Sequence, residues 1–249
     1  MPERRLAVVL AQVCGAAFRG ALCIVVYLLA PPALSSERWG GAVAAVSDYA
    51  YRGISQTRGA PALQVGLYRE LPGGWSVGAW GSNVDFGRWN DTTYELNAHL
   101  TRFWSLADDW SAQLTYTRYF YTDQRAGYDY DELLASLTYR QRVTATIAWS
   151  PNVSLYSPGT MAWERQATSY ELTVLQPIGP RWSLTAGAGH YDLTDLFDDG
   201  YWYWSAGIAF AWDSLQLDIV HIGTDHTARR LFVEDTTGSR LSAGLTWRF

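Results

Sequence analysis

The last nine residues of this chain alternate strictly between apolar and polar side chains. Leu241, Ala243, Leu245, Trp247 and Phe249 occupy every second position, and Ser242, Gly244, Thr246 and Arg248 stand between them. A period of two places the apolar side chains on one face of a β-strand and the polar side chains on the other. The segment is therefore predicted to be a strand with one apolar and one polar face.

Segments of about ten residues with the same alternation recur along the chain, and twelve of them can be delimited. They are residues 41–51, 62–71, 75–85, 94–104, 110–121, 129–140, 142–150, 169–178, 181–191, 201–212, 214–222 and 240–249. In the first, Val43, Ala45, Tyr49 and Tyr51 share one face, and Asp48 and Arg52 share the other. No run after residue 35 approaches the roughly 18 apolar residues that a spanning helix needs. An all-β fold is predicted.

The connections between these segments alternate in length. Short turns are expected at residues 72–74, 105–108, 141, 179–180 and 213. Longer connections are expected at residues 53–61, 86–92, 122–128, 151–168, 192–200 and 223–239. An even number of antiparallel strands, with tight turns at one end and longer loops at the other, is typical of outer-membrane barrels. The sequence predicts an up-and-down transmembrane β-barrel of about 12 strands, with the outer membrane of a Gram-negative bacterium as its location.

The aromatic residues are distributed in agreement with a barrel. The chain contains 13 Trp and 16 Tyr, and eight aromatic residues lie beside a short turn or in the last strand. These are Trp75, Trp104, Trp110, Tyr139, Trp182, Trp212, Trp247 and Phe249. Amphipathic aromatic rings accumulate where a bilayer meets water. We expect these eight to form a girdle at one membrane interface, with the lipid bilayer as their partner.

The N-terminal residues have the features of an export signal. Arg4 and Arg5 precede an apolar stretch at residues 21–30, which is followed by two prolines and small residues. Residues 1–35 are therefore predicted to be a signal peptide that is removed, leaving residues 36–249 as one barrel domain. Both cysteines, Cys14 and Cys23, fall in this leader, so no disulfide is expected. The remaining 16 basic and 23 acidic residues argue against a nucleic-acid partner.

Three strings in the first half of the chain resemble one bacterial family. They are Ser-Asp-Tyr-Ala-Tyr-Arg-Gly-Ile-Ser-Gln at 47–56, Pro-Ala-Leu-Gln at 61–64 and Trp-Gly-Ser-Asn-Val-Asp at 80–85. Together they look like the TorF-type putative porins, bacterial outer-membrane proteins. The final strand also resembles those of outer-membrane barrels, whose terminal Phe is read by the barrel-assembly machinery; here that residue is Phe249. The resemblance implies a porin-like channel and supplies no catalytic residues.

The polar faces of the strands are expected to line the barrel lumen. The charged and titratable candidates are Asp48, Arg52, Glu95, His99, Glu132, Arg140, Glu171, Asp218 and Arg248. Acidic groups in a narrow pore favour cations, because low-dielectric walls focus the field. Two interpretations stay open, since the same carboxylates could instead pair with Arg52, Arg140 and Arg248. No cofactor and no metal site is expected.

Two other functions remain as alternatives to a channel for small hydrophilic solutes. One is an outer-membrane barrel enzyme of the lipase or protease type, for which His190 and His221 lie near the outer strand ends. The other is a closed structural or adhesive barrel that acts through its outer loops. No local motif identifies a nucleophile, so we predict that the protein is not an enzyme. The sequence leaves the solute and the oligomeric state open.

Overall fold

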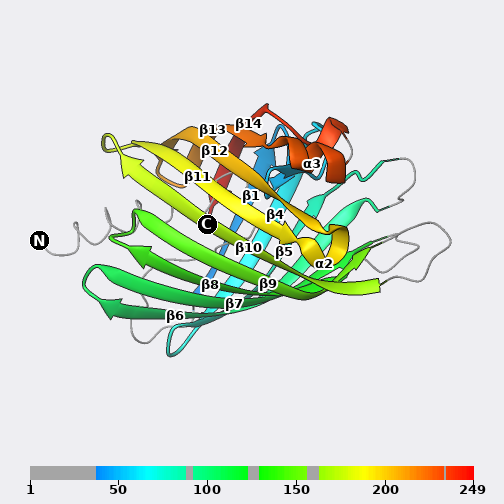
Figure 1. The fold of residues 1–249 in the computed structure, drawn as a ribbon. Helices are drawn as coiled ribbons and strands as arrows, with labels where there is room; N and C mark the ends of the chain where they lie inside the picture. The colour runs from blue at the N-terminus through cyan, green and yellow to red at the C-terminus, as the bar shows by residue number, and fades with distance from the viewer. Residues whose placement is uncertain (1–37, 88–91, 123–128, 156–162, 233) are drawn as a thin grey trace, which may run out of the picture.

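The computed structural model describes residues 38–87, 92–122, 129–155, 163–232 and 234–249, and these residues form a closed antiparallel barrel (Figure 1). Twelve strands form the wall: β1 (Arg38–Val46), β4 (Ala62–Leu71), β5 (Trp75–Asn83), β6 (Tyr94–Ala107), β7 (Trp110–Tyr121), β8 (Tyr130–Tyr139), β9 (Val143–Leu155), β10 (Trp163–Pro177), β11 (Trp182–Leu193), β12 (Asp199–Trp212), β13 (Leu215–Thr224) and β14 (Arg240–Arg248). The prediction of an up-and-down barrel of 12 strands is confirmed. The predicted signal peptide, residues 1–35, lies outside the described residues.

Each wall strand pairs with its neighbours in sequence, and β14 closes the barrel by pairing with β1 in the register Ala45↔Leu245. Two backbone hydrogen bonds extend this seam. The Gly41 amide donates to the Phe249 carbonyl at 2.9 Å, and the Phe249 amide donates to the Gly41 carbonyl at 3.0 Å. Closure leaves no sheet edge exposed, which is the condition for a strand structure to lie in a bilayer.

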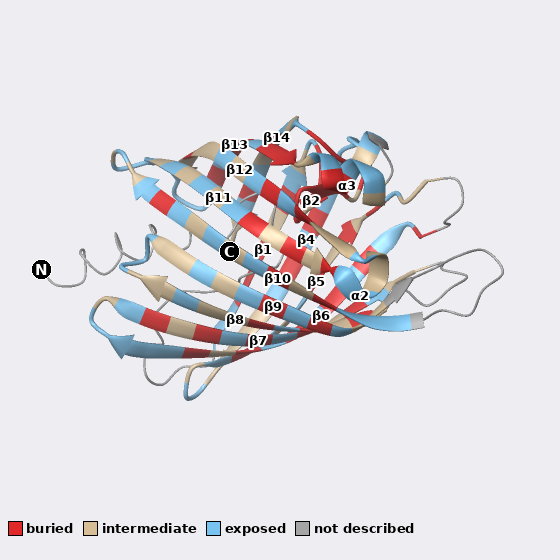
Figure 2. Ribbon diagram, viewed as in Figure 1, coloured by how far each residue is buried: buried red, intermediate tan, exposed pale blue. Residues whose placement is uncertain are grey.

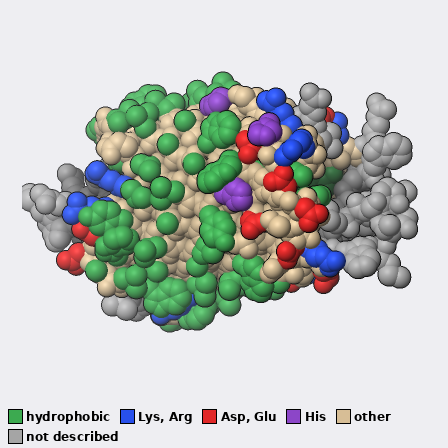
Figure 3. Space-filling view, viewed as in Figure 1, with side chains coloured by type: hydrophobic (Ala, Val, Ile, Leu, Met, Phe, Trp, Pro, Cys, Tyr) green, Lys and Arg blue, Asp and Glu red, His purple; other side chains and the backbone are tan. Residues whose placement is uncertain are grey.

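The alternation in sequence becomes an alternation between the two faces of the wall. In β4, Leu63, Val65 and Leu67 are exposed outside, while Gln64 between them is 2% exposed and faces the interior. The same alternation of exposed and buried residues runs along the other strands (Figure 2). Hydrophobic side chains cover much of the visible outer wall, and acidic side chains gather towards one end (Figure 3). An apolar exterior around a polar interior is the arrangement that lipid requires.

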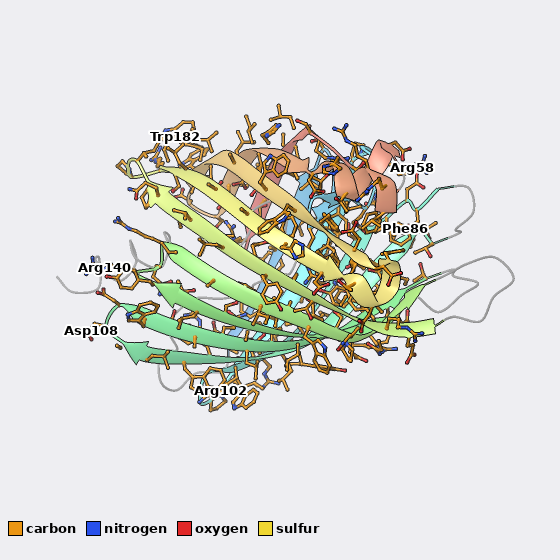
Figure 4. The ribbon with its side chains drawn as sticks, viewed as in Figure 1. Arg58, Phe86, Arg102, Asp108, Arg140 and Trp182 are labelled. Carbon is orange, nitrogen blue, oxygen red and sulfur yellow. The ribbon has the colours of Figure 1, made fainter. Side chains whose placement is uncertain are left out.

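The two ends of the barrel differ as the connection lengths predict. Tight turns follow β4, β6, β8, β10 and β12, and we call this the short-turn end. Arg102, Asp108, Arg140 and Trp182 lie towards it, whereas Arg58 and Phe86 lie towards the opposite, long-loop end (Figure 4). Helices α2 (Thr194–Phe197), α3 (His226–Leu231) and η1 (Glu234–Thr236) lie in the connections of the long-loop end. No helix in the described part of the chain is both long and apolar enough to cross a membrane.

The structure corrects two of the predicted strand limits. The first strand ends at Val46, not at residue 51, and the chain then turns into the barrel. The predicted loop at residues 151–168 is largely strand, because β9 continues to Leu155 and β10 starts at Trp163. Pro151 cannot donate a ladder hydrogen bond, so a strand continues past it only where the pairing is irregular. A register shift between Arg165 and Ala167 on the partner strand accommodates the proline there.

Candidate functional site: a hairpin folded into the lumen

Residues 47–61, which connect β1 to β4, fold into the barrel and not over its rim. The segment contains a two-stranded hairpin of β2 (Ala50–Tyr51) and β3 (Ile54–Ser55), and we call residues 47–61 the lumen hairpin. It contacts the wall on several sides. The Tyr49 hydroxyl donates to Glu95 of β6 at 3.1 Å, and the Tyr201 hydroxyl of β12 donates to the Arg52 carbonyl at 3.0 Å. Strands far apart around the barrel are thereby bridged through its interior.

The tip of the lumen hairpin is the dipeptide Arg52-Gly53. Both residues have positive φ, 48° and 80°, which is the backbone that a two-residue hairpin turn of type I′ requires. A β-carbon at Gly53 would lie 2.5 Å from the Thr224 methyl and 2.8 Å from Cβ of Tyr203. Only glycine therefore lets the tip rest directly on β12 and β13.

Arg52 holds the tip to β8. Its guanidinium lies 2.6 Å from the Glu132 carboxylate, and both side chains are 1% exposed. Glu132 also accepts hydrogen bonds from the hydroxyls of Tyr51, Tyr119 and Ser150 at 3.2, 3.4 and 3.1 Å. A buried charge pair with this many hydrogen bonds fixes the tip in one position.

The base of the lumen hairpin is organised by Asp48. Its carboxylate accepts from the hydroxyls of Ser55 and Thr57 within the hairpin, the latter at 3.0 Å. It also accepts from the Arg240 guanidinium of β14 at 2.9 Å. Asp48 thus satisfies the hairpin's own hydroxyl groups and ties its base to the last strand.

The side of the lumen hairpin packs on β5. Tyr49 meets Trp80 edge-to-face with ring centroids 5.6 Å apart. The Asn83 side chain accepts from the Leu63 amide at 2.8 Å and donates to the Pro61 carbonyl at 3.1 Å, where the chain leaves the hairpin. The hairpin and its support on β5 coincide with the three strings that resemble the TorF-type porins. Those strings therefore encode one structural unit inside the barrel.

An apolar cluster closes the long-loop side of the lumen hairpin. Its buried members are Ile54, Ala167, Tyr191, Leu193, Tyr201, Tyr203 and Ala228. Phe197 of α2 and Phe232 beyond α3 pack against this cluster, with their ring centroids 6.1 Å apart. No local pattern in the sequence links these residues, because they come from five separate parts of the chain. They pack the lumen hairpin against the long-loop ends of β10, β11 and β12.

The short-turn half of the interior is different. Along β8 to β12, most inward side chains nearer the short-turn end are partly exposed, although Leu175 and Ala209 are buried. The partly exposed residues are Ser136, Thr138, Thr144, Thr146, Glu171, Thr173, Ser183, Thr185 and Ser205. On the same strands nearer the hairpin, the inward residues Leu134, Ala148 and Ser169 are buried. Solvent therefore reaches an inner wall that is lined mostly by hydroxyl groups.

The predicted lumen residues fall into three groups. Asp48 and Arg52 lie in the lumen hairpin, not on the wall. Glu95, His99, Glu132, Glu171, Asp218 and Arg248 lie on wall strands, at positions that alternate with the exposed outer residues. Arg140 does not face the lumen. It lies in the turn after β8 with a φ of 51° and pairs with Asp109 at 2.9 Å. The hydrogen bond and charge of Asp109 raise the pKa of Arg140.

The eight aromatic residues predicted as a girdle lie on the outer wall near the short-turn end. Seven are at least 37% exposed, and Tyr139 packs on Trp110 with ring centroids 4.8 Å apart. The guanidinium of Arg102 lies 5.6 Å from the Trp75 ring centre and 5.2 Å from that of Trp104. Pairs of this kind suit a boundary between lipid and water.

Two histidines near the long-loop end face outwards. His190 packs against Trp202 with ring centroids 4.9 Å apart, and Nε2 of His221 lies 2.6 Å from the Ser239 hydroxyl. Among the described residues, no group of three or more His, Cys, Asp or Glu side chains could hold a metal ion.

A family of bacterial proteins of unknown function, Gcw_chp, matches residues 32–245 of the chain. The chain belongs to this family. The match covers the lumen hairpin and the wall strands from β1 into β14, where it ends at residue 245, so the unit described above lies within the part that characterises Gcw_chp proteins. No curated protein matches the chain in sequence.

Solved porin structures share the fold of this Gcw_chp protein. A KdgM porin is similar with a TM-score of 0.54 and 5% identity, over 84% of this chain and 99% of the porin. A NanC porin has a TM-score of 0.54 and 9% identity, over 84% of this chain and 98% of the porin. At these identities the likeness establishes a porin-type barrel and nothing finer.

Proposed function

We propose that this Gcw_chp protein is a narrow outer-membrane channel for small hydrophilic solutes, of the kind called TorF-type putative porins. The observation that supports it most directly is the contrast between the two faces of the wall. The outer face carries exposed Leu, Val, Ile and aromatic side chains, and the inner face of β8 to β12 carries partly exposed hydroxyl groups. A polar and partly exposed inner face is typical of a barrel whose lumen admits water and solutes.

The lumen hairpin is the part that narrows this channel. Three ion pairs among the described residues anchor it, Arg52–Glu132, Asp48–Arg240 and Arg58–Asp235, and it rests on the wall from β5 to β14. Barrels of eight strands are filled by side chains and those of about 16 leave an open channel. Twelve strands with an inserted hairpin therefore favour a small passage along the β8–β12 side, with a size limit set by the hairpin.

The short-turn end would face the periplasm and the lipid bilayer would cover the apolar wall. In this orientation the girdle of eight aromatic residues lies where the periplasmic surface of the membrane meets water. We further propose that strand β14, through Trp247 and Phe249, is the segment that the barrel-assembly machinery binds. Deleting Phe249 should lower the yield of heat-modifiable, folded protein in the outer membrane. Replacing it by Tyr, which keeps the aromatic ring, should not.

The inner charges favour cations. Among the described residues, six inward carboxylates outnumber four inward guanidinium groups. The acids are Asp48, Glu70, Glu95, Glu132, Glu171 and Asp218, and the arginines are Arg38, Arg52, Arg240 and Arg248. An excess of negative charge inside low-dielectric walls raises the local concentration of cations. A KdgM porin of similar fold has been observed in complex with disordered oligogalacturonate, with a TM-score of 0.52 to this chain and 4% identity. A different solute is expected here, because an acidic lumen disfavours anions.

Single-channel recording tests the proposal. The protein purified from outer membranes should produce stable current steps in planar bilayers, and a salt gradient should give a reversal potential of the sign set by cations. A folded barrel that carries no current at any voltage would contradict a channel function.

A hydrolytic function is the second candidate, and one contact favours it. His221 Nε2 lies 2.6 Å from the Ser239 hydroxyl, and both side chains are exposed on the outer wall near the long-loop end, where lipid esters would lie. Such a pair can transfer a proton from a serine nucleophile. Hydrolysis of phospholipid or 4-nitrophenyl esters should then be lost in Ser239→Ala and His221→Ala but kept in His190→Ala. Equal background hydrolysis by all four proteins would exclude this activity.

A further inference from the structure

The inward carboxylates do not share one environment. Glu132 and Asp48 each lie within 3 Å of a guanidinium group, at 2.6 Å from Arg52 and 2.9 Å from Arg240. Each of these pairs is close to neutral as seen from a distance, because the two charges nearly coincide. Neither carboxylate can therefore contribute much to the field that a permeating ion experiences.

Glu95 and Asp218 are removed from the passage in another way. Glu95 is 1% exposed and accepts hydrogen bonds from Tyr49 and Asn97 at 3.1 and 2.9 Å. Asp218 is 6% exposed and accepts from the Gln216 amide at 2.7 and 2.8 Å. Both carboxylates are thus covered by neighbouring side chains, and a hydrated ion cannot come into contact with them.

Glu171 of β10 differs from all four. It is partly exposed, and none of the ion pairs found among the described residues includes it. Its neighbours in the same row of the wall are Thr146 of β9 and Gly189 of β11. The Tyr203 side chain of β12 leans across Gly189 towards Glu171, so a hydroxyl lies on each side of the carboxylate, which stays partly exposed to the lumen between them.

The position of Glu171 along the barrel is also distinctive. The next inward residue on β10 towards the long-loop end, Ser169, is buried, whereas the next one towards the short-turn end, Thr173, is partly exposed. Glu171 therefore marks the level at which the partly exposed inner wall gives way to the more closely packed part beside the lumen hairpin. A charge at the narrow end of a water-filled space acts on every ion that passes.

We propose that Glu171 is the residue that sets the cation preference of the channel. The inference rests on the proposed channel function and deepens it, since it selects one of six inward carboxylates. The sixth, Glu70, lies at the short-turn end of β4 opposite Arg38 of β1 and so away from the narrow level. It predicts that hydrated monovalent cations and small protonated amines are favoured at the level of Glu171.

The test compares reversal potentials in a potassium chloride gradient. Glu171→Gln keeps the size of the side chain and should move the ratio of cation to anion permeability roughly two- to tenfold towards unity, the scale expected for one charge in a confined passage. Asp218→Asn is the matched control, because it neutralises a covered carboxylate, and it should leave the ratio unchanged. A wild-type protein without current contradicts the channel function. A conducting Glu171→Gln variant with the wild-type ratio contradicts only the role of Glu171.

Chemical restoration of the charge gives an independent measurement. Residues 36–249 contain no cysteine, so Glu171→Cys places a single thiol in the predicted mature protein. A methanethiosulfonate reagent that attaches a carboxylate should restore the cation preference of this variant. A reagent that attaches a quaternary ammonium group should reverse it. Equal reversal potentials before and after both modifications, with labelling verified by mass, would overturn the proposal.

Discussion

Arg52 and Glu132, which are 80 residues apart in the chain, form an ion pair of 2.6 Å in which both side chains are 1% exposed. The pair joins the tip of the lumen hairpin to the middle of the wall. Because the arginine adopts a positive φ of 48° in the turn, its backbone conformation is maintained by contacts made at the tip. The position of the lumen hairpin therefore depends on whether the Arg52–Glu132 ion pair is formed.

Removal of one partner from this pair should destabilise the protein strongly. Glu132→Gln leaves the Arg52 guanidinium buried without its counter-charge, and breaking a buried pair in this way costs about 3–5 kcal/mol. The urea midpoint of the folded barrel in detergent should fall accordingly. Asp109→Asn, which breaks the exposed pair with Arg140, is the control and should have no measurable effect.

The double variant Arg52→Met with Glu132→Leu separates charge from packing. It removes both charges and keeps apolar volume, a replacement that is often neutral or stabilising for buried pairs. The urea midpoint should return most of the way to the wild-type value. A double variant as unstable as Glu132→Gln would show that the hydrogen bonds of Glu132, and not the unpaired charge, carry the stability.

Shortening the lumen hairpin should enlarge the channel. If residues 49–56 are replaced by a few glycine and serine residues, the wall strands keep their pairing and the contacts to Glu95 and Glu132 are lost. The single-channel conductance should rise severalfold, and larger neutral solutes should pass in a liposome-swelling assay. Inserting the same residues at the exposed turn at Gly179 is the control. Unchanged conductance in the shortened variant would place the ion path away from the hairpin.

The barrel could be predicted from sequence because each of its signals is local. Strand alternation is set by residues two apart, and turn lengths are set by a few consecutive residues. The lumen hairpin has no such signal, since Asp48, Ala50 and Arg52 continue the alternation of β1 as a straight strand would. Its partners Glu95 and Arg240 lie 46 and 192 residues away from their hairpin contacts. A lone inward charge on each of several strands is the one feature of the sequence that indicates a charged partner inside the lumen.

Alternation assigns a residue to the inner or the outer face only where the strand is regular. Glu171 and Asp218 lie in regular strands, so counting by two assigns their faces. The prediction that Arg140 lines the lumen is wrong. The turn after β8 begins at this residue, and its positive φ takes the side chain out of the alternation. Pairing of the inward charges depends on the hairpin, so the sequence alone could not decide which carboxylates are neutralised.

Gly189 should be intolerant of substitution. In its row of the wall, Tyr203 of β12 leans across it, so that a β-carbon would lie 2.4 Å from the tyrosine ring and 2.8 Å from the Tyr170 carbonyl. Overpacking of this kind costs about 1–3 kcal/mol, and Gly189→Ala should lower the urea midpoint to match. Gly179→Ala is the matched control, because no atom lies within 4 Å of its β-carbon. Equal midpoints for the two variants would contradict the close contact.

The lumen hairpin should act as a fixed constriction and not as a moving gate, because ion pairs hold its base and tip and an apolar cluster covers its far side. A disulfide between Gly53→Cys and Tyr203→Cys tests this. A β-carbon placed at residue 53 would lie 2.8 Å from that of residue 203 and 2.5 Å from the Thr224 methyl. The tip must therefore move slightly away from β12 and β13 to reach the roughly 3.8 Å of a disulfide. Oxidation should leave the conductance and the open probability of the double variant as they are in its reduced form. The two single-cysteine variants control for the loss of Tyr203 and for the strain at Gly53. A current that falls or rises on oxidation of the double variant alone would mean that the hairpin moves during conduction.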